Sequence, residues 1–379
     1  MPHLLLAPDK FKGSLTAVEV AAHLAAGLRR ADPGLAMTPL PVADGGDGTV
    51  DAAVAAGFER RAVTVAGPLG DPVAAGFAVH GDTAVVELAE ASGLRRLPGG
   101  RPAPLRTGTY GTGELIRAAL DAGARRIVLG VGGSASTDGG TGMLAALGAR
   151  FLDGAGAPLP PGGGALGRLD RVELGGLDRR LGGVQVVLAS DVDNPLLGAL
   201  GAAAVYGPQK GADPDAVARL DAGLARLAAV LDRAAGPGAG TAGAAEWPGA
   251  GAAGGAGYGA LAVLGAVRRP GIEVLLEVLG FERALRRATL VVTGEGSLDA
   301  QTLHGKAPLG VAAAAARRGV PAVAVCGRLG LTAAQLERAG FRRAYALTAL
   351  QPDPDRCLTE AGPLLERIGA RLARDLPAH

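Results

Sequence analysis

The sequence predicts an α/β protein made of two distinct α/β domains with a cleft between them, and two observations support this prediction. The chain has 379 residues, more than the roughly 100–200 residues of one ordinary domain. Short apolar runs of strand length alternate with alanine-rich segments of helical period, which is the βαβ rhythm of a mainly parallel sheet. A cleft between two such domains is a common place for a substrate to bind.

At the N-terminus this alternation of strands and helices starts with an apolar run and a helical segment. His3 to Ala7 reads as a strand and Thr16 to Ala31 as a helix, with Thr16 and Glu19 at the spacing of a capping box. The elements expected after them are strands at 37–42, 127–131, 184–189, 290–292, 321–325 and 344–347, and helices at 49–56, 111–122, 309–318 and 332–340.

The pattern changes between Val63 and Leu88, where short alternating strands surround a turn of glycine, proline and aspartate. This change predicts a hairpin and a crossing into the second domain. The last third returns to the alternation of strands and helices, so we expect a discontinuous first domain of residues 1–65 plus 288–379 and a second domain of residues 66–287, with approximate boundaries. Within the second domain, residues 236–257 are rich in glycine and alanine, and composition alone favours a flexible surface loop there.

Composition and charge exclude several classes of protein. The net charge is only +2 and the arginines are scattered, which argues against nucleic acid as a partner. Two cysteines, Cys326 and Cys357, are too few for a disulfide framework and favour a reducing compartment. The chain starts without the features of a signal peptide and has no unbroken apolar run of membrane-spanning length. We therefore expect a cytoplasmic protein with no membrane partner.

Lysine is rare in a chain that otherwise uses arginine. Of the 38 basic residues 34 are Arg, and the four lysines are Lys10, Lys12, Lys210 and Lys306. All four lie near glycine in loop-like segments. A lysine ammonium is a compact charge that suits close contact with a phosphate oxygen, whereas arginine needs room for its planar fork. The pattern favours phosphate or carboxylate contacts, and chance survival of solvated surface lysines is the competing explanation.

Asn194 is the only asparagine in the chain and follows Asp191 after a predicted strand. Polar side chains at the carboxyl ends of parallel strands lie where ligands bind in open α/β sheets. An Asx turn before Pro195 is the alternative, and both interpretations can hold together.

A glycine-rich loop runs from Gly130 to Gly140 and contains Ser134, Ser136 and Thr137. It follows a predicted strand and precedes a predicted helix, so its backbone N–H groups and hydroxyls can face an anion. No Walker motif is present, because the Gly305-Lys306 pair is followed by Ala307. No strand-borne dinucleotide fingerprint is found either, which argues against a nicotinamide-dependent dehydrogenase.

Carboxylates beside glycine complete the candidate site. They are Asp44, Asp47, Asp138, Asp191, Glu295 and Asp299. Phosphoryl transfer needs one carboxylate to accept or orient the proton of the attacking hydroxyl and others to hold Mg²⁺. Calcium binding is the rival, but the position where an EF-hand starting at Asp44 requires Glu is Ala55.

Ordered motifs along almost the whole chain resemble those of the type-1 glycerate kinases. They are Ala7 to Leu15, Val42 to Thr49, Gly111 to Ile116, Gly130 to Gly140, Asp191 to Gly198, Gly207 to Ala212, Pro248 to Gly255 and Thr293 to Lys306. The resemblance implies a kinase that phosphorylates D-glycerate with ATP and Mg²⁺. It also implies a Rossmann-like or flavodoxin-like domain with a parallel sheet beside a mixed α/β domain, and it makes the stretch from Pro248 to Gly259 a family motif instead of a linker.

The resemblance also suggests roles for single residues. Asp191 is the first choice for the catalytic base and Asp299 the second, while Lys210 would neutralise charge on the transferred group. The expected substrate contacts are Lys12, Ser14, Asp44, Asp47 and Asn194. The expected nucleotide contacts are Gly132, Gly133, Ser134, Ser136, Gly294, Glu295 and Lys306. The expected Mg²⁺ ligands are Asp44, Asp191 and Glu295.

Two questions stay open at this point. A two-domain binding protein for a small anionic metabolite is the alternative function, and formation of ADP from ATP and D-glycerate distinguishes the two. The resemblance favours 2-phosphoglycerate over 3-phosphoglycerate as product, although a small shift of the substrate decides which hydroxyl is in line. Either a monomer or a homodimer is compatible with the sequence.

Overall fold

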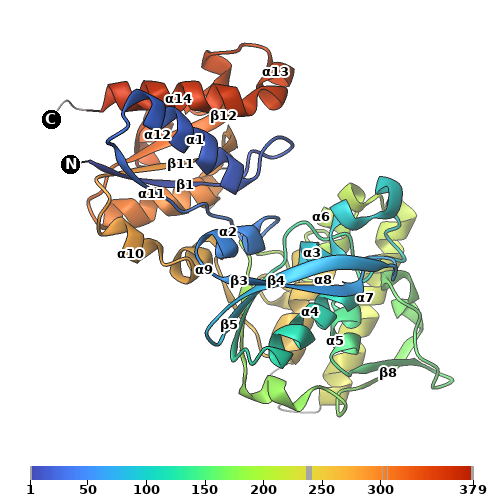
Figure 1. Cartoon of the computed structure of the whole chain (residues 1–379). Helices are drawn as coiled ribbons and strands as arrows, with labels where there is room; N and C mark the ends of the chain where they lie inside the picture. The colour runs from blue at the N-terminus through green and yellow to red at the C-terminus, as the bar shows by residue number, and fades with distance from the viewer. Residues whose placement is uncertain (1, 236–240, 301, 305, 377–379) are drawn as a thin grey trace. The chain divides into compact units, whose positions relative to one another are not determined.

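The computed structural model describes residues 2–235, 241–300, 302–304 and 306–376. The chain divides into two compact units, which are described separately here (Figure 1). Unit 1 consists of residues 1–44, 51–57 and 272–379, and unit 2 consists of residues 45–50 and 58–271. Both units are α/β, which confirms the predicted fold class.

Unit 1 contains a five-stranded sheet in the order β13-β12-β11-β1-β2, and all of its neighbouring strands are parallel. The strands are β1 (His3–Pro8), β2 (Ala36–Pro39), β11 (Leu290–Leu298), β12 (Ala322–Leu329) and β13 (Phe341–Ala346). Counted along this unit alone, the spatial order is 2-1-3-4-5, which is the flavodoxin-like arrangement. The strand order reverses between β1 and β11, which form the switch point of this sheet.

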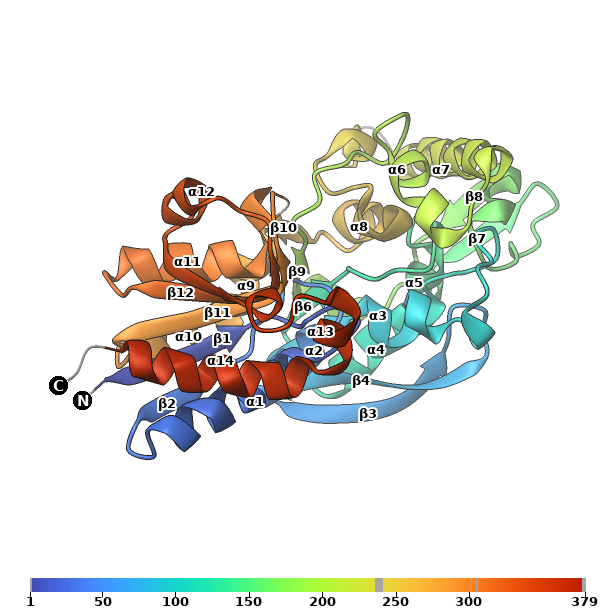
Figure 2. The ribbon, with the colours of Figure 1, turned by 90° about the horizontal axis from the view of Figure 1, so that it is seen from above.

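Two long helices cover one face of this sheet, α1 (Ala17–Ala31) and α14 (Ala361–Asp375), and Figure 2 shows them side by side. Thr16 caps α1, and both hydrogen bonds of the predicted capping box with Glu19 are present. Gly27 permits the close approach of the two helices, because a Cβ there would lie 2.0 Å from the carbonyl oxygen of Glu366. Leucines from both helices and from β1 form the buried core of the unit.

The remaining elements of unit 1 connect and flank these strands. They are α2 (Thr49–Ala55), which spans the junction with unit 2, α9 (Gly271–Val278), α10 (Phe281–Leu285), η7 (Thr302–His304), α11 (Ala307–Arg317), α12 (Ala333–Arg338), η8 (Leu347–Ala349) and α13 (Pro354–Thr359).

Unit 2 contains a six-stranded mixed sheet in the order β10-β9-β6-β5-β4-β3. The strands are β3 (Glu59–Ala66), β4 (Pro72–His80), β5 (Thr83–Glu87), β6 (Arg126–Gly130), β9 (Gln185–Ala189) and β10 (Val267–Arg269). β3, β4 and β5 are antiparallel neighbours, which confirms the predicted hairpin, while β5, β6, β9 and β10 run parallel. The loops after these four parallel strands therefore leave the sheet at one edge.

A large apolar core and several helices support this sheet, with Phe77 and Tyr258 among its largest buried side chains. A separate two-stranded sheet pairs β7 (Arg150–Asp153) with β8 (Leu169–Glu173). The helical elements are α3 (Leu88–Ser92), η1 (Leu94–Arg96), η2 (Pro98–Gly100), α4 (Tyr110–Asp121), α5 (Thr141–Ala146), η3 (Gly163–Arg168), η4 (Arg179–Gly183), α6 (Ala202–Tyr206), η5 (Pro208–Lys210), α7 (Pro214–Ala235), η6 (Ala244–Glu246) and α8 (Ala252–Val263).

Within the glycine-rich stretch, residues 241–257 do not form the flexible surface loop that composition predicts. Residues 236–240 lie outside the described part, but 241–257 form η6 and the start of α8. Ala250 and Ala252 are fully buried, and the Tyr258 N–H donates to the Ala250 carbonyl oxygen at 3.0 Å. Small residues are needed here because the chain packs closely against neighbouring backbone, so low side-chain bulk reflects packing instead of disorder.

The compact units divide the chain at different residues from those expected. β3 pairs along its whole length with β4, so Glu59–Ala66 belongs to unit 2 although the first domain was expected to extend to residue 65. At the other end, α9 and α10 belong to unit 1, which resumes at Ile272 instead of residue 288. Gly310 of α11 lies against the side chain of Ile272, where a Cβ would approach within 2.6 Å.

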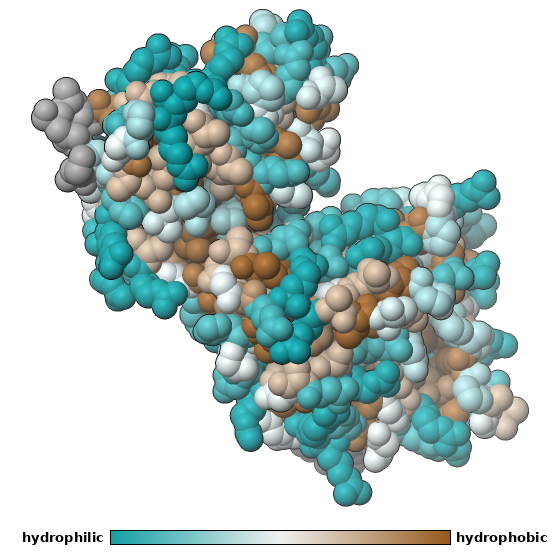
Figure 3. All heavy atoms as spheres, viewed as in Figure 1, coloured by the Kyte–Doolittle hydropathy of each residue, from teal (hydrophilic) through white to brown (hydrophobic). Residues whose placement is uncertain are grey.

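Within the described ranges, no helix combines the length and the apolar character needed to cross a membrane. On the face shown in Figure 3, hydrophilic residues cover much of each unit and apolar residues form short patches.

Candidate active site

In unit 1, acidic residues gather at the switch point of the parallel sheet. Asp9 follows the end of β1, and its N–H donates to the carbonyl oxygen of Gly294 on β11 at 2.8 Å. Glu295 is the next residue of β11, so both carboxylates lie just beyond the last β1–β11 pairing, between Pro8 and Gly294. The carboxyl ends of strands at a switch point are where open α/β sheets bind ligands.

Asp9 is the most perturbed of these carboxylates. It is only 6% exposed, and burial raises its pKa to about 7, with the negative charges of Asp44 and Glu295 acting in the same direction. Lys10 opposes the shift, with its Nζ 3.7 Å from Oδ1 of Asp9. At Asp9, burial and the two neighbouring carboxylates therefore outweigh the positive charge of Lys10.

Glu295 is held by two partners from the segment that follows its strand. The Thr302 hydroxyl donates to Oε1 at 2.6 Å, and Nζ of Lys306 donates to Oε2 at 3.3 Å. Burial nevertheless raises the pKa of Glu295, which these two contacts oppose. Thr302 also accepts from the N–H of Asp299 at 3.1 Å, and the Ser297 hydroxyl donates to the Asp299 carboxylate at 3.0 Å. One hydrogen-bonded network thus fixes both predicted acids.

Two expected substrate contacts, Lys12 and Ser14, lie in the loop that follows Asp9. The Lys12 side chain is exposed. The Ser14 hydroxyl already donates to the carbonyl oxygen of Leu358 at 2.7 Å, so it is engaged in holding the loop to unit 1. Substrate binding by Lys12 and Ser14 stays a prediction, and of the two the Lys12 side chain is the more exposed.

In unit 2, the candidate residues follow the four parallel strands at the shared edge of the mixed sheet. Glu87 ends β5, the Gly130 to Gly140 loop follows β6, Asp191 follows β9, and Gly271 follows β10. These segments contact one another: the Ser190 N–H donates to the Arg269 carbonyl oxygen at 3.1 Å, and the Gly271 N–H donates to Oδ1 of Asp191 at 2.9 Å.

Lys210 is buried against the glycine-rich loop. Its Nζ donates to the carbonyl oxygen of Ser136 and, at 3.4 Å, to the hydroxyl oxygen of Ser134. The Ser134 and Ser136 hydroxyl oxygens are 3.1 Å apart. Burial lowers the pKa of Lys210 to about 7, and the negative charge of Asp138 opposes this shift. The three side chains therefore form one cluster that can supply donors and an adjustable positive charge to an anion.

Asp138 fixes the shape of the loop. Its Oδ2 accepts from the Thr109 N–H at 2.9 Å, the Thr109 hydroxyl at 2.8 Å and the Gly142 N–H at 3.1 Å, while Oδ1 accepts from the Gly140 N–H at 3.1 Å. A buried carboxylate with this many donors has its partners within the protein. Asp138 is thus a positioning residue for the loop.

The glycine-rich stretch at the start of α8 packs directly on this loop. The Gly139 N–H donates to the Gly254 carbonyl oxygen at 3.0 Å. A Cβ at Gly254 would lie 2.0 Å from the carbonyl oxygen of Ser136, so no larger residue fits. The Ser134 hydroxyl is also 3.4 Å from the carbonyl oxygen of Ala253, which has a φ of +52°. The stretch therefore shapes the loop, which is why it lacks side-chain bulk.

Asp47 and Glu87 organise the segment that lies over the start of the loop. Glu87 accepts from the N–H groups of Gly48, at 3.2 Å, and Val50, at 3.1 Å. Burial raises the pKa of Glu87 to about 7, which its contacts with Val50 and Arg95 oppose. Asp47 has a buried Oδ1 with no partner among the described residues, and a Cβ on Gly133 would lie 2.5 Å from it. Gly133 thus lets an incompletely satisfied carboxylate approach the loop.

Asp191 and Asn194 differ in their availability to a ligand. Asp191 is exposed, and one of its oxygens accepts from Gly271. Both ends of the Asn194 amide have partners, because Nδ2 donates to Leu200 at 2.8 Å and Oδ1 accepts from the Tyr206 hydroxyl at 2.7 Å. These contacts reach residues six and twelve positions further along and do not form the expected Asx turn, and substrate binding by Asn194 stays a prediction.

The residues of unit 1 fit a divalent cation by their charge. Asp44 and Glu295 both raise the pKa of buried Asp9, and a cation between carboxylate oxygens would relieve this repulsion. Mg²⁺ is commonly bound by one or two carboxylates, with phosphates and waters completing its shell. In the described part of the chain no three acidic, His or Cys side chains group as metal ligands, and Asp191 lies in unit 2. The expected Mg²⁺ ligands Asp44, Asp191 and Glu295 stay a prediction.

Sequence reasoning missed Asp9, Glu87 and Thr109 as site residues. Asp9 and Glu87 each follow an apolar strand run, which is the pattern that identified Asp191 and Glu295. Thr109 is recognisable only in three dimensions, because its partner Asp138 is 29 residues away.

Comparisons with known proteins place the chain among glycerate kinases. The model of the glycerate kinase family matches residues 4–377. The chain is 44% identical to a glycerate kinase of Bacillus subtilis over 99% of its length and 97% of that protein. It is also 44% identical to the glycerate 2-kinase of Escherichia coli, over 86% of its length and 85% of that protein. A crystal structure assigned to glycerate kinase 2 of Salmonella typhimurium LT2 is similar with a TM-score of 0.83 and 41% identity, covering 98% of this chain and 97% of that one.

Proposed function

The chain belongs to the glycerate kinase family, and we propose that it transfers the terminal phosphoryl group of ATP to the 2-hydroxyl of D-glycerate with the help of Mg²⁺. Membership of this family identifies the chain as a kinase. The name of the Escherichia coli relative, glycerate 2-kinase, supports the choice of the 2-hydroxyl.

The observation that carries the proposal is the buried cluster of Lys210, Ser134 and Ser136. Lys210 is 3% exposed, and in the described part of the chain no carboxylate lies within ion-pairing distance of its ammonium. Its charged form therefore has a high desolvation cost. A phosphate group among these donors would supply the missing negative charge and stabilise the ammonium. We propose that the cluster contacts ATP phosphates and that Lys210 neutralises charge that develops on the transferred group.

The backbone of the same loop supports a phosphate contact. Gly133, with a φ of +74°, has no side chain, so its peptide is the proposed contact for a phosphate oxygen, whereas the N–H of Gly132 already donates to the carbonyl oxygen of Gly45 at 3.2 Å. A Cβ on Gly132 would already clash with Gly46 at 2.5 Å, so Gly132 is also required by packing.

Carboxylates would supply the remaining chemistry. We propose Asp191 as the base that accepts the proton of the glycerate hydroxyl, because its side chain is exposed at the carboxyl end of β9 and the Gly271 N–H holds its Oδ1 in place at 2.9 Å. Asp299 is the second candidate, although the Ser297 hydroxyl already engages its carboxylate.

In unit 1, Asp44 and Glu295 would hold Mg²⁺, and the Lys306 ammonium would partly neutralise the Glu295 carboxylate. The bound ion would supply positive charge that shields the phosphate oxygens. Lys12 is the proposed contact for the carboxylate of glycerate, because its side chain is exposed in the loop after β1.

The test of the proposed activity is formation of ADP by purified protein with D-glycerate, ATP and Mg²⁺. ADP should form only when glycerate, nucleotide and Mg²⁺ are all present. A binding protein for an anionic metabolite would bind glycerate in calorimetry and release no ADP, and that result would overturn the proposal. L-glycerate is the matched control, because it has the same charge and functional groups with the opposite configuration at C2.

A further inference from the structure

Glu87 is a buried carboxylate of unit 2 whose hydrogen bonds are directed at one short segment of backbone. It is the last residue of β5 and is 1% exposed. The Gly48 N–H lies 3.2 Å from both of its oxygens, and the Val50 N–H donates to Oε2 at 3.1 Å. Nη2 of Arg95 donates to Oε1 at 3.1 Å. Both oxygens thus accept hydrogen bonds, and two of the three donors belong to residues 45–50.

This segment, residues 45–50, depends on contacts from outside for its conformation. Three of its six residues are glycine, and glycine loses more conformational freedom on folding than any other residue. On one side, the Gly45 carbonyl oxygen accepts from the Gly132 N–H at 3.2 Å. On the other side, the contacts of Glu87 hold Gly48, which has a φ of +93°. The segment is therefore fixed between the glycine-rich loop and Glu87.

Asp47 is the one charged residue of this segment, and the fold does not satisfy it. Its Oδ1 is buried and has no hydrogen-bond partner in the described part of the chain. The same oxygen lies close to the glycine-rich loop, because a Cβ on Gly133 would be 2.5 Å from it. A buried acceptor without a donor costs stability. Glu87 thus holds the segment in a conformation that is unfavourable for Asp47, which points to a ligand that supplies the missing donor.

We propose that Glu87 is a positioning residue of the reaction, which holds the Asp47 carboxylate beside Gly133 to accept a hydrogen bond from a hydroxyl group of glycerate. The inference rests on the proposed function, in which Asp47 is an expected substrate contact. A hydroxyl group of the substrate can donate to Oδ1 and so satisfy it. Because Glu87 already fixes the segment, the carboxylate needs no rearrangement when the substrate binds.

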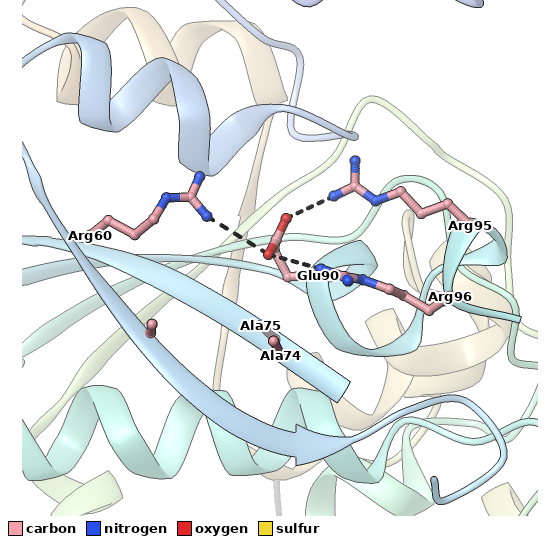
Figure 4. Close-up of a pocket in the computed structure, with 7 residues that line it drawn as sticks. Arg60, Ala74, Ala75, Glu90, Arg95 and Arg96 are labelled. Atoms are coloured by element: carbon pink, nitrogen blue, oxygen red, sulfur yellow. Dashed lines mark hydrogen bonds and ion pairs between the residues drawn. The ribbon is translucent and has the colours of Figure 1, made fainter. Parts of the chain in front are cut away.

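Glu90 offers a matched control for Glu87. It is also buried, at 8% exposed, and it accepts from Arg95 at 2.8 Å and from Arg96 at 3.2 Å (Figure 4). Glu87→Gln and Glu90→Gln therefore each remove one negative charge that contacts Arg95, but only Glu87→Gln changes an anchor of the segment. The amide of Glu87→Gln fits in neither orientation, because both carboxylate oxygens accept hydrogen bonds and its NH₂ group would face a donor.

The first measurement is hydrogen–deuterium exchange of the full chain, resolved at the amides of Gly48 and Val50, and it does not depend on activity. In Glu87→Gln these amides should exchange about tenfold faster than in the wild type, because a charge-assisted hydrogen bond to each is lost or weakened. In Glu90→Gln they should exchange as in the wild type. Unchanged exchange in Glu87→Gln would overturn the proposal.

The second measurement is a double-mutant cycle of Glu87→Gln and Asp47→Asn in steady-state kinetics with D-glycerate and MgATP. Glu87→Gln should raise KM for glycerate about tenfold with a smaller change in kcat. A variant that only loses folded protein would instead lower the apparent kcat at unchanged KM. Because Glu87 acts through Asp47, the double variant should be no worse than Asp47→Asn alone. Losses that add would overturn the proposal.

Gly48→Ala supplies an independent variant if Glu87→Gln fails to fold. A Cβ on Gly48 would have open space around it, but its φ of +93° is one that alanine rarely adopts. Gly48→Ala should therefore raise KM for glycerate, and it should add nothing to Asp47→Asn. Wild-type protein that forms no ADP would overturn the proposed reaction, whereas normal turnover with unchanged exchange in Glu87→Gln would overturn only the role of Glu87, so the two failures are distinguishable.

Discussion

Nζ of Lys210 lies 3.4 Å from the hydroxyl oxygen of Ser134, although the two residues are 76 positions apart in the sequence. Lys210 ends η5, and Ser134 belongs to the loop after β6. The contact therefore brings a loop side chain and a distant lysine into one buried cluster. Because burial lowers the pKa of Lys210 to about 7, the protein maintains this contact against a cost in desolvation.

The first prediction concerns catalysis by this cluster. Lys210→Met keeps the length of the side chain and removes its charge, so kcat should fall by about 10²–10³-fold if Lys210 stabilises the transferred group. Steady-state kinetics with D-glycerate and MgATP measures the change. Lys12→Met is the comparison in unit 1, because Lys12 is exposed; as a proposed substrate contact it should mainly raise KM for glycerate. A Lys210→Met enzyme with wild-type kcat would remove Lys210 from the mechanism.

The second prediction concerns the pH dependence of stability caused by Lys210. Its pKa is about 7 in the folded chain and near 10.5 when unfolded, so between these values the unfolded state binds more protons. Stability contributed by this group therefore rises with pH across that window, and its penalty is complete below pH 7. Lys210→Met should exceed the wild type in unfolding free energy most at pH 7 and least at pH 9.5, as measured by urea denaturation. A difference that is independent of pH contradicts the assignment.

The third prediction assigns the base. Asp191→Asn should lower kcat by about 10²–10⁴-fold with a much smaller change in KM, because a general base acts mainly in the transition state. Asp193→Asn is a close control, since Asp193 is an exposed carboxylate two positions away that pairs with Arg268. If Asp191→Asn retains its kcat and Asp299→Asn loses it, Asp299 takes the role.

The fourth prediction concerns the acids of unit 1. Burial raises the pKa of Asp9 from 3.8 to about 7, so the folded chain binds more protons than the unfolded chain between these values. The destabilisation from Asp9 is thus complete above pH 7 and vanishes below pH 4. Asp9→Asn should be more stable than the wild type at pH 8, and this advantage should shrink towards pH 4. Thermal unfolding at several pH values measures it, and a constant difference would contradict the raised pKa.

The fifth prediction tests the cation site without using activity. Mg²⁺ alone should raise the Tm of the wild type, because it relieves repulsion among Asp9, Asp44 and Glu295. The shift should be smaller in Glu295→Gln and unchanged in Glu282→Gln, which alters an exposed acid of the same unit that pairs with Arg318. Equal shifts in all three proteins would place the cation elsewhere.

The sequence predicted much of the fold because strand and helix periods are local properties. The capping box of Thr16 and Glu19 and the hairpin after Val63 were both recognisable from neighbouring residues. The residues at which unit 1 ends and resumes could not be recognised from neighbouring residues. The pairing of β3 with β4 and the packing of Ile272 on Gly310, which set them, are tertiary contacts.

Some residues of the candidate site could likewise be identified from the sequence, and others only from the structure. The rarity of lysine indicated Lys210, the glycine-rich loop indicated Ser134, and a position after a predicted strand indicated Glu295. The burial that perturbs the pKa values of Asp9 and Glu87 depends on the assembled sheets. Asn194 stood out by its rarity, but its amide contacts with Leu200 and Tyr206, six and twelve residues further along, could be found only in the structure. Composition also misjudged residues 241–257, where glycine reflects close backbone packing on Ser136.

Phosphorus NMR of the reaction mixture tests the central claim most directly. With D-glycerate, ATP and Mg²⁺, the terminal phosphate signal of ATP should decrease while a phosphomonoester signal grows in equal amount. Coupling to the single proton on C2 should split that signal into a doublet if the 2-hydroxyl is phosphorylated. A triplet from the two protons on C3 would contradict the proposed position, and ATP signals that remain unchanged would contradict the kinase activity itself.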